Sequence, residues 1–505
     1  MYVCFRIIAV TTTDCRCVAW VTIDMLSDAT LLEIFDIYLG IFPENWYILI
    51  HVCQNWRTII FGSVRRLDLQ LRCTAGTRVR EIPDIWPPLP IVIENEGHER
   101  WGVDNIVAAL ENYNNRIIGI YLWPLSDAFS SSEMEEILAA MQQPFPALRD
   151  LDLESAPVDF ASFLGGSAPC LQELCLNLIT FPGFPKLLFS ATHLVRLTLV
   201  EIHHSGYFSP EEMVTGLSVL TRLEFLKITF KSRQSRPDRR CSSPQTRTLL
   251  PALADLRFDG VIEYLEDLVA RIDAPLLNFL KITLFHEQIF DTPHLNQFIS
   301  RTSNFGARDE AHLKFIGPEV ISPCVCVTLP ISSREEQSVA LELGILSKQP
   351  DWQLSSLAQL CISSFPQGVL PVVERLYIKC EFSRPHWQGD IEISQWLELL
   401  HPFTAVKDLY ISQDFAASVA LVLQELKGER VTEVLPALQT LLFEELLPSG
   451  PVLEIIGEFV AARGLVGHPI TVSRWRLSWR ARSESGKKLT DEGRCRCTYT
   501  FYITT

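Results

Sequence analysis

A short phrase of hydrophobic and polar positions returns along most of the chain: an apolar residue, two variable ones, a leucine, one variable residue and a second apolar residue. Because strand side chains alternate between two faces, the leucine and the apolar residue after it point to one side. We therefore predict a short strand at each phrase. The phrases are LRDLDL from Leu148, LQELCL from Leu171, LVRLTL from Leu194, LEFLKI from Leu223, LADLRF from Leu253, LNFLKI from Leu277, VERLYI from Val373, VKDLYI from Val406 and LQTLLF from Leu438.

The spacing of the phrases points to a repeat protein. The central leucines are Leu151, Leu174, Leu197, Leu226, Leu256 and Leu280, at steps of 23, 23, 29, 30 and 24 residues, then Leu343, Leu376, Leu409 and Leu441, at steps of 33, 33 and 32. The phrase and these steps are typical of leucine-rich repeats. Segments 211–220, 261–272 and 392–400 have helical periodicity between the strands. We predict an α/β leucine-rich-repeat solenoid over residues 66–480, with parallel strands on the concave face and helices outside.

Some stretches are less regular. Alternating apolar residues predict further strands at 67–71, 91–93 and 118–122. Residues 286–340 break the register, and two candidate strands, near Leu313 and at 324–329, predict a hairpin insertion there.

A polar segment, residues 231–247, interrupts the array between two strand phrases. It is rich in Lys, Arg, Ser and Pro and has no apolar face, so we predict an exposed, mobile insertion.

The residues before the repeats have a different pattern, that of two short helices. Ser27 or Asp28 can cap a helix in which Leu31, Ile34, Phe35 and Tyr38 recur at helical spacing. Pro43 separates it from a second predicted helix, whose shared face is formed by Trp46, Leu49, Val52, Cys53, Trp56 and Ile60. Two helices this apolar need a third helix or a partner to bury their faces.

Residues 26–65 resemble the F-box. Leu26, Leu31, Ile34 and Phe35 match the first half of that motif, and Val52, Cys53, Trp56 and Arg57 match its Val-Cys-x-x-Trp-Arg ending. Ser27 stands where the family has proline, and Ala29 and Thr30 also depart from it. The resemblance implies binding to a Skp-type adaptor through Leu26, Leu31, Ile34, Phe35, Val52, Cys53 and Trp56. The alternative is that these helices only cap the solenoid, since terminal repeats need shielding.

The combination of F-box and leucine-rich repeats resembles a large family of basidiomycete fungal F-box proteins. The segments that carry this likeness are VRRLDLQLRCTAGTRVREIPDIWPPLPIVIE, SFLGGSAPCLQEL, EYLEDLVARIDAPLL and WLELLHPFTAVKDLYIS. The resemblance implies a substrate-recognition adaptor of an SCF-type ubiquitin ligase, with a Skp-type adaptor, a cullin and an unidentified protein substrate as partners. The alternative is a leucine-rich-repeat interaction scaffold whose F-box is non-functional.

Charge and composition narrow the functional classes. The net charge of −16 argues against a nucleic-acid partner, because phosphate contacts need a basic surface. The fourteen cysteines include three C-x-C pairs, Cys15/Cys17, Cys324/Cys326 and Cys495/Cys497, without the further ligands of a zinc site. We therefore expect reduced thiols and no metal or cofactor. No apolar run approaches the ~20 residues that cross a bilayer, so we expect no membrane partner.

The chain also lacks the motifs of the common catalytic classes. It has no G-x-S-x-G, P-loop, dinucleotide-binding or H-E-x-x-H motif, so we expect no enzyme activity. Residues 1–25 are expected to be a lead-in rather than a signal peptide, and 481–505 a tail. We expect a cytoplasmic or nuclear protein.

The variable positions of the strand phrases give a candidate substrate surface. They are acidic in the first repeats and gain cations and aromatic residues in the later ones. Tyr, Phe and Arg are enriched at interface hot spots. The predicted substrate-binding residues are Phe225, Arg257, Phe279, Lys281, Arg375, Tyr377 and Tyr410. An ordinary solvated sheet face is the alternative interpretation.

Overall fold

The structure is a computed structural model, and it describes most of residues 26–475. The described ranges are 26–42, 45–73, 88–94, 103–123, 131–154, 160–178, 185–233, 246–285, 290–316, 324–330, 339–346, 354–381, 392–426, 428–444 and 450–475. The predicted lead-in, the predicted tail and most of the 231–247 insertion lie outside these ranges. The chain divides into unit 1, Met1–Gly183 with Ser190–Leu194, and unit 2, Phe184–Phe189 with Val195–Thr505.

Unit 1 begins with three short helices, α1 (Asp28–Ile41), α2 (Trp46–Ile50) and α3 (Gln54–Gly62). Ser27 caps α1, because its hydroxyl accepts a hydrogen bond from the Thr30 amide at 3.2 Å. The prediction of a single second helix is wrong, because α2 and α3 are separate helices. Cys53 has an extended backbone and its Sγ accepts from the Trp56 amide at 3.4 Å, so α3 begins anew after it. Val52, Cys53 and Trp56 therefore do not share one helical face.

The rest of unit 1 is a parallel sheet with helices between its strands. It consists of β1 (Leu71–Cys73), β2 (Ile91–Glu94), α4 (Val103–Asn112), β3 (Ile117–Leu122), α5 (Ser131–Ala140), β4 (Asp150–Leu153) and β5 (Glu173–Asn177). Two details differ from the predicted strands. Leu67 and Leu69 are buried but precede β1. Ile118 is the extra residue of a β-bulge, because Ile91 pairs with Ile117 and Val92 with Gly119.

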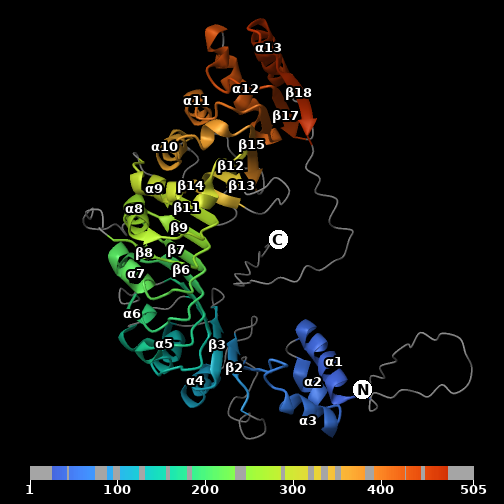
Figure 1. Cartoon of the computed structure of the whole chain (residues 1–505), viewed down its shortest axis with the longest axis vertical. Coiled ribbons are helices and arrows are strands. Elements are labelled where there is room, and N and C mark those ends of the chain that lie inside the picture. Colours follow the sequence, from blue (N-terminus) through green and yellow to red (C-terminus); the bar gives the residue numbers. More distant parts are fainter. Residues whose placement is uncertain are drawn as a thin grey trace, which may run out of the picture. The chain divides into compact units, whose positions relative to one another are not determined.

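Unit 2 contains a longer sheet with helices along one of its faces (Figure 1). Its strands are β6 (Arg196–Ile202), β7 (Phe225–Phe230), β9 (Asp255–Gly260), β11 (Phe279–Phe285), β12 (Glu310–Ile316), β13 (Cys324–Pro330), β14 (Val339–Leu346), β15 (Arg375–Glu381), β16 (Asp408–Ile411), β17 (Thr440–Glu444) and β18 (Thr471–Trp475), besides the separate pair β8 (Thr248–Leu249) and β10 (Ile272–Asp273). Its helices are α6 (Pro185–Leu188), α7 (Pro210–Leu217), α8 (Ile262–Arg271), α9 (Pro293–Arg301), α10 (Leu354–Ser364), α11 (Ile393–Leu400), α12 (Ala416–Glu425) and α13 (Pro451–Leu465).

The register of the strands confirms the repeat phrase. In parallel pairs Leu226 faces Leu197 and Leu256, and Leu409 faces Leu376 and Leu441. These central leucines are fully buried beneath the helices, as the phrase predicts. Helices α7, α8 and α11 lie where helical periodicity placed them. The chain thus has an α/β leucine-rich-repeat fold in which most of the sheet is parallel.

The irregular stretch reverses the order of three strands. In space the order is β11, β14, β13, β12, β15, with β13 antiparallel to both of its neighbours. The predicted hairpin is confirmed as β12 and β13, but the regular step of 33 residues from Leu343 to Leu376 does not place these leucines on neighbouring strands. Leu343 pairs with Ile282 on β11, and Leu376 pairs with Ala311 on β12. The reversal keeps the apolar side chains of all three strands in the core.

The core of unit 2 lies between the sheet and its helices. Around α8, Tyr264 packs edge-on against Phe230 at 4.6 Å between ring centroids and stacks on Phe258 at 5.9 Å. Gly260 leaves room for these rings, since a Cβ there would lie 2.8 Å from Phe258 and 2.9 Å from Phe230. The opposite sheet face has no helix over it in the described part of unit 2, and we call it the open sheet face (Figure 1).

Candidate protein-interaction surfaces

The three N-terminal helices pack around an aromatic pair. The rings of Phe35 and Trp56 meet edge-on at 4.7 Å between centroids. Leu31 and Phe35 are each 1% exposed, and Ile60 is fully buried. Two of the predicted adaptor-binding residues, Leu31 and Phe35, are thus core residues with no surface to offer a partner. Leu26, Cys53 and Trp56 are half-buried, whereas Ile34 and Val52 are exposed.

Exposed apolar side chains concentrate on α1, α2 and the residues that follow each of them. Of the sixteen large exposed hydrophobic residues in the described ranges, seven lie between positions 34 and 52. Ile37 is 69% exposed, and with Ile34 and Ile41 it follows the three- and four-residue steps of one helical face. We call these seven residues the apolar helix surface: Ile34, Ile37, Ile41, Phe42, Tyr47, Ile48 and Val52.

The same helices are also attached to the start of the repeats. Trp46 is buried, and its Nε1 donates a hydrogen bond to the Gln70 carbonyl at 2.9 Å, one residue before β1. Arg57 Nε donates to the Ile50 carbonyl at 3.1 Å and so ties α3 to the end of α2. Through Trp46 the N-terminal helices therefore contact the segment that leads into β1. The apolar helix surface stays exposed.

On the open sheet face of unit 2, register aligns one residue from each strand into a line. From β7 to β16 the line runs Lys227, Arg257, Lys281, Glu342, Thr328, His312, Tyr377 and Tyr410. Four of the predicted substrate-binding residues, Arg257, Lys281, Tyr377 and Tyr410, belong to it. Phe225, Phe279 and Arg375 lie two positions earlier on their own strands. The prediction that these side chains share one face is confirmed by the strand register.

Arg257 lies between two phenylalanine rings. Its guanidinium carbon is 5.1 Å from the Phe225 centroid and 4.8 Å from that of Phe279, while the guanidinium carbon of Arg196 is 4.2 Å from the Phe225 centroid. Such stacking suits arginine, whose planar charge is weakly hydrated. Asp255 orients the group by accepting from Nε at 3.1 Å and from Nη2 at 2.9 Å. We call Arg196, Phe225, Asp255, Arg257 and Phe279 the Arg257 cluster.

The neighbouring cations in the line differ in their surroundings. Lys281 is paired with Glu342, with 2.6 Å between Nζ and Oε1, and this carboxylate raises the pKa of the ammonium against the lowering effect of burial. Lys227 has no ion pair in the described structure. Asp259 is half-buried near both lysines, and burial raises the pKa of its carboxyl although Thr283 and Thr229 hydrogen-bond to it. The Arg257 side of the open face therefore has an excess of positive charge.

Aromatic rings dominate the face over β12, β15, β16 and β18. Tyr377 and Tyr410 stack with 4.0 Å between centroids and 11° between planes. His312 lies 4.7 Å from Tyr377, and Trp475 meets both tyrosines edge-on at 6.0 and 5.6 Å. Lys379 Nζ is 4.6 Å from the Tyr377 centroid. We call His312, Tyr377, Lys379, Tyr410 and Trp475 the tyrosine cluster.

His312 in this cluster is bound to a carboxylate. Its Nε2 lies 2.7 Å from Glu310 Oε1. Burial is the largest influence and lowers the pKa of His312, against the raising effect of Glu310. We therefore assign a neutral imidazole at pH 7, with Nε2–H donating to the carboxylate.

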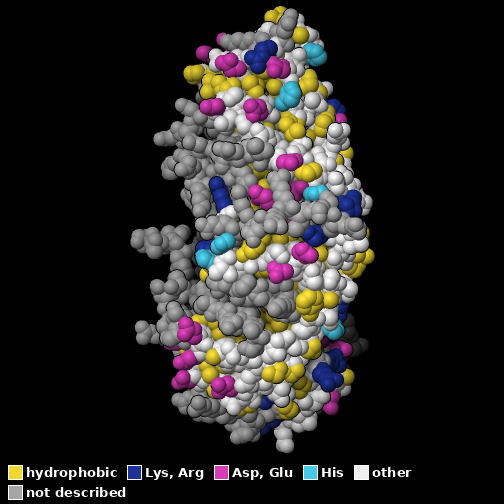
Figure 2. Space-filling model, turned by 90° about the vertical axis from the view of Figure 1, so that its left-hand side faces the viewer, with side chains coloured by type: hydrophobic (Ala, Val, Ile, Leu, Met, Phe, Trp, Pro, Cys, Tyr) yellow, Lys and Arg dark blue, Asp and Glu magenta, His cyan; other side chains and the backbone are white. Residues whose placement is uncertain are grey.

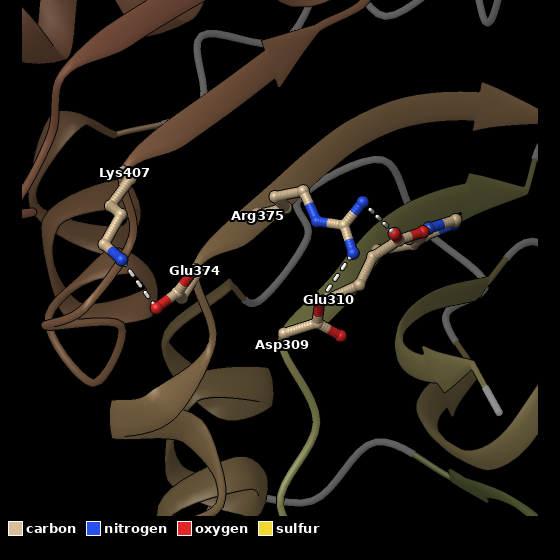
Figure 3. Close-up of polar contacts among 6 residues, drawn as sticks. Asp309, Glu310, Glu374, Arg375 and Lys407 are labelled. Atoms are coloured by element: carbon tan, nitrogen blue, oxygen red, sulfur yellow. Dashed lines mark hydrogen bonds and ion pairs between the residues drawn. The ribbon is translucent and has the colours of Figure 1, made fainter. Parts of the chain in front are cut away.

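Ion pairs hold the start of these strands (Figure 3). Arg375 Nη2 lies 2.6 Å from Asp309 Oδ2, and Nη1 lies 3.4 Å from Glu310 Oε2. A similar ion pair joins the residues just before β15 and β16, where Lys407 Nζ lies 2.6 Å from Glu374 Oε1. Arg375, predicted to bind substrate, is thus engaged by two carboxylates and joins the start of β15 to the start of β12.

Several residues of these clusters were not predicted. Trp475 lies on a strand without the leucine phrase, and His312 and Glu342 lie in the strands whose order is reversed. The sequence does contain a weak indication that Arg196 belongs to the Arg257 cluster. It occupies the same position of the repeat phrase as Phe225, Asp255 and Phe279. Only the three-dimensional register connects the others to the predicted set.

Unit 1 presents an acidic sheet face of its own. Asp150 and Glu173 are paired in register across β4 and β5, and Tyr121 is hydrogen-bonded to Asp150. Burial, and then the neighbouring Glu173 carboxylate, raise the pKa of Asp150 to about 6. Burial likewise raises the pKa of Asp152. The acidic character predicted for the first repeats is therefore present in unit 1.

On the helix-covered side, the described residues show no comparable gathering of one type. Figure 2 shows acidic and basic side chains interspersed with hydrophobic ones there. In the ranges that the structure describes, no three His, Cys, Asp or Glu side chains form a group able to hold a metal ion. The described helices are all too short or too polar to span a bilayer.

Comparisons with known proteins give a limited result. No family model matches the sequence, and no curated protein matches it. Among solved structures, the chain is similar to the leucine-rich repeat-containing protein LegL7 from Legionella pneumophila, at 14% identity and a TM-score of 0.27, over 77% of this chain and 97% of that one. The leucine-rich-repeat assignment itself rests on the register of the strand phrases.

Proposed function

We propose that this chain is a substrate-recognition adaptor of an SCF-type ubiquitin ligase. In this proposal the N-terminal helices bind a Skp-type adaptor, which links the chain to a cullin, and the open sheet face binds a protein substrate. The chain then holds a substrate and performs no chemistry itself, as a protein of the cytoplasm or nucleus.

The observation that carries the proposal is the apolar helix surface. A small set of helices that exposes Ile34, Ile37 and Ile41 on one face leaves apolar area in water that a partner would cover. Burying one such side chain fully is worth roughly 1.5–3 kcal/mol, so three of them supply a large share of a stable interface. The F-box resemblance supports a Skp-type adaptor as the partner.

The structure revises which residues should matter. Substitutions of Leu31, Phe35 and Trp56 should weaken adaptor binding by destabilising the helices, because these side chains pack between the helices. The exposed Ile34 and Ile37 should act by contact. Ser27 has the φ of −67° that proline requires, but its hydroxyl caps α1, so Ser27→Pro would lose about 1 kcal/mol of helix stability.

The experiment is co-purification of the full chain with a Skp-type adaptor and a cullin. Ile37→Asp should weaken adaptor binding at least ten-fold, because it places a charge in the covered interface. Ile362→Asp is the matched control: this isoleucine on α10 is 62% exposed, and its replacement should leave binding unchanged. Absence of binding by the wild-type chain, or equal loss in both variants, would reject the proposal.

A second candidate is an interaction scaffold whose helices only cap the repeats. The bond from Trp46 to the Gln70 carbonyl favours it, because it shows the helices attached to the strand that they would shield. On this alternative, Trp46→Phe would expose the first strands to faster hydrogen exchange, and the wild-type chain would not bind the adaptor.

A further inference from the structure

The open sheet face of unit 2 carries two chemically different clusters at a defined separation. The Arg257 cluster is centred on β9 and the tyrosine cluster on β15 and β16. Five strand-to-strand steps lead from Arg257 to Tyr377, through β11, β14, β13 and β12. At the usual spacing of about 4.8 Å between strands, the two residues are about 24 Å apart.

The Arg257 cluster is suited to an anionic group. Both Phe225 and Phe279 contact the guanidinium, and Asp255 accepts from Nε and Nη2, so Nη1 remains without a bond in the described structure. Lys227, the next residue in the line, has no ion pair there. A cation held rigidly beside a second, unpaired one binds a carboxylate with little loss of side-chain entropy.

The tyrosine cluster is suited to a flat apolar group. Its rings are already fixed against one another by stacking and edge contacts, and so they lose little freedom when a ligand covers them. Beside it, Arg375 is paired with Asp309 and Glu310, and the neutral His312 is hydrogen-bonded to Glu310, which leaves less charge to repel an apolar side chain. Aromatic residues of this kind are typical anchors at protein interfaces.

Between the two clusters, the line of residues offers no unpaired charge to a charged ligand. Lys281 is occupied by Glu342, and Thr328 lies between Glu342 and His312. The carboxylates Asp255, Glu342 and Glu310 interrupt the positive charge along the face. A uniformly anionic polymer such as a nucleic acid would meet these carboxylates at each cluster, whereas a peptide with one acidic part avoids them.

We propose that the open sheet face recognises an extended peptide that carries an acidic residue and an aromatic residue about seven positions apart. At about 3.4 Å per residue, seven residues span the 24 Å between Arg257 and Tyr377. The acidic residue binds at Lys227 and Arg257, and the aromatic one covers Tyr377 and Tyr410. This inference rests on the proposed function and names the class of substrate segment that the adaptor takes.

The test uses the full chain and a display library of random twelve-residue peptides, followed by fluorescence anisotropy of the selected sequences. Selected peptides should pair an Asp or Glu with a Trp, Tyr or Phe six to eight positions away, in one order. Lys227→Glu and Tyr410→Ala should each weaken binding at least ten-fold. Only the effect of Lys227→Glu should shrink at high salt, because only that contact is ionic.

Arg222→Glu is the matched control, an exposed cation in the turn before β7 and outside the two clusters. It should leave binding unchanged. Selected peptides without the spaced pair, equal binding by all variants, or displacement by a mixed-sequence oligonucleotide at similar concentration would overturn the inference. Adaptor binding depends on the N-terminal helices instead, so loss of Skp-type binding with intact peptide selection would reject the proposed function alone.

Discussion

Arg463 on α13 offers a sharp test of how the last repeats are held together. Its side chain is fully buried, and its guanidinium donates to backbone carbonyls before β17: Nη1 to Val431 at 3.2 Å, and Nη2 to Pro436 and Leu438 at 3.1 Å each. Burial lowers the pKa of this group. The charge is thus solvated by carbonyl dipoles of the chain.

Replacing Arg463 with methionine keeps the apolar stem and removes these donors. Three hydrogen bonds from a charged donor are worth roughly 1.5–3 kcal/mol each. The change also removes the cost of burying a charge, which is several kcal/mol. The difference leaves a net destabilisation of about 3 kcal/mol, confined to the segments that the guanidinium joins.

The assay is hydrogen exchange of the full chain, which reports local opening. A loss of about 3 kcal/mol should accelerate exchange in β17 and β18 roughly a hundred-fold, at about 1.4 kcal/mol per factor of ten. Strands β3 and β4 of unit 1 serve as the internal reference. Arg463→Lys, which retains the charge on one nitrogen, should show a smaller acceleration. If β17 in Arg463→Met exchanges within three-fold of wild type, the reasoning is refuted.

Three further outcomes are expected. Trp56→Ala should destabilise the N-terminal helices by about 3 kcal/mol, as loss of a packed aromatic does, and unchanged melting of those helices by circular dichroism would contradict the packing. Gly344→Ala should cost about 1–3 kcal/mol in urea unfolding, because its Cβ would lie 2.9 Å from Cys326 Cβ across the reversed strands; a neutral result would argue against that strand order. Asp150, whose pKa of about 6 lies above its ordinary value, binds its proton more tightly in the folded state, so the stability it provides is present near pH 4 and lost as pH rises through 6. Asp150→Asn should therefore stabilise unit 1 at pH 7 and not at pH 4 in hydrogen exchange, and an equal effect at both pH values would refute this.

The local pattern of apolar and polar residues was enough to predict most of the strands and helix α1 from the sequence. The phrase around Leu226, Leu256 and Leu409 predicted strands, their inward side and their parallel pairing, because alternation within six residues decides which face is apolar. The same phrase placed Arg257 and Tyr377 on the open sheet face, since each is one residue away from a buried leucine. Helix α1 was likewise predicted from its cap and its periodicity.

Tertiary structure decided what local pattern leaves open. Strand β13 is apolar at nearly every position, so its sequence does not say which neighbours it pairs with, and the reversed order of β12, β13 and β14 follows only from how the three strands pack together. That order brings His312 beside Tyr377 and Glu342 beside Lys281. Contacts between residues far apart in the chain depend on which strands are neighbours in space, and no window of sequence contains that information.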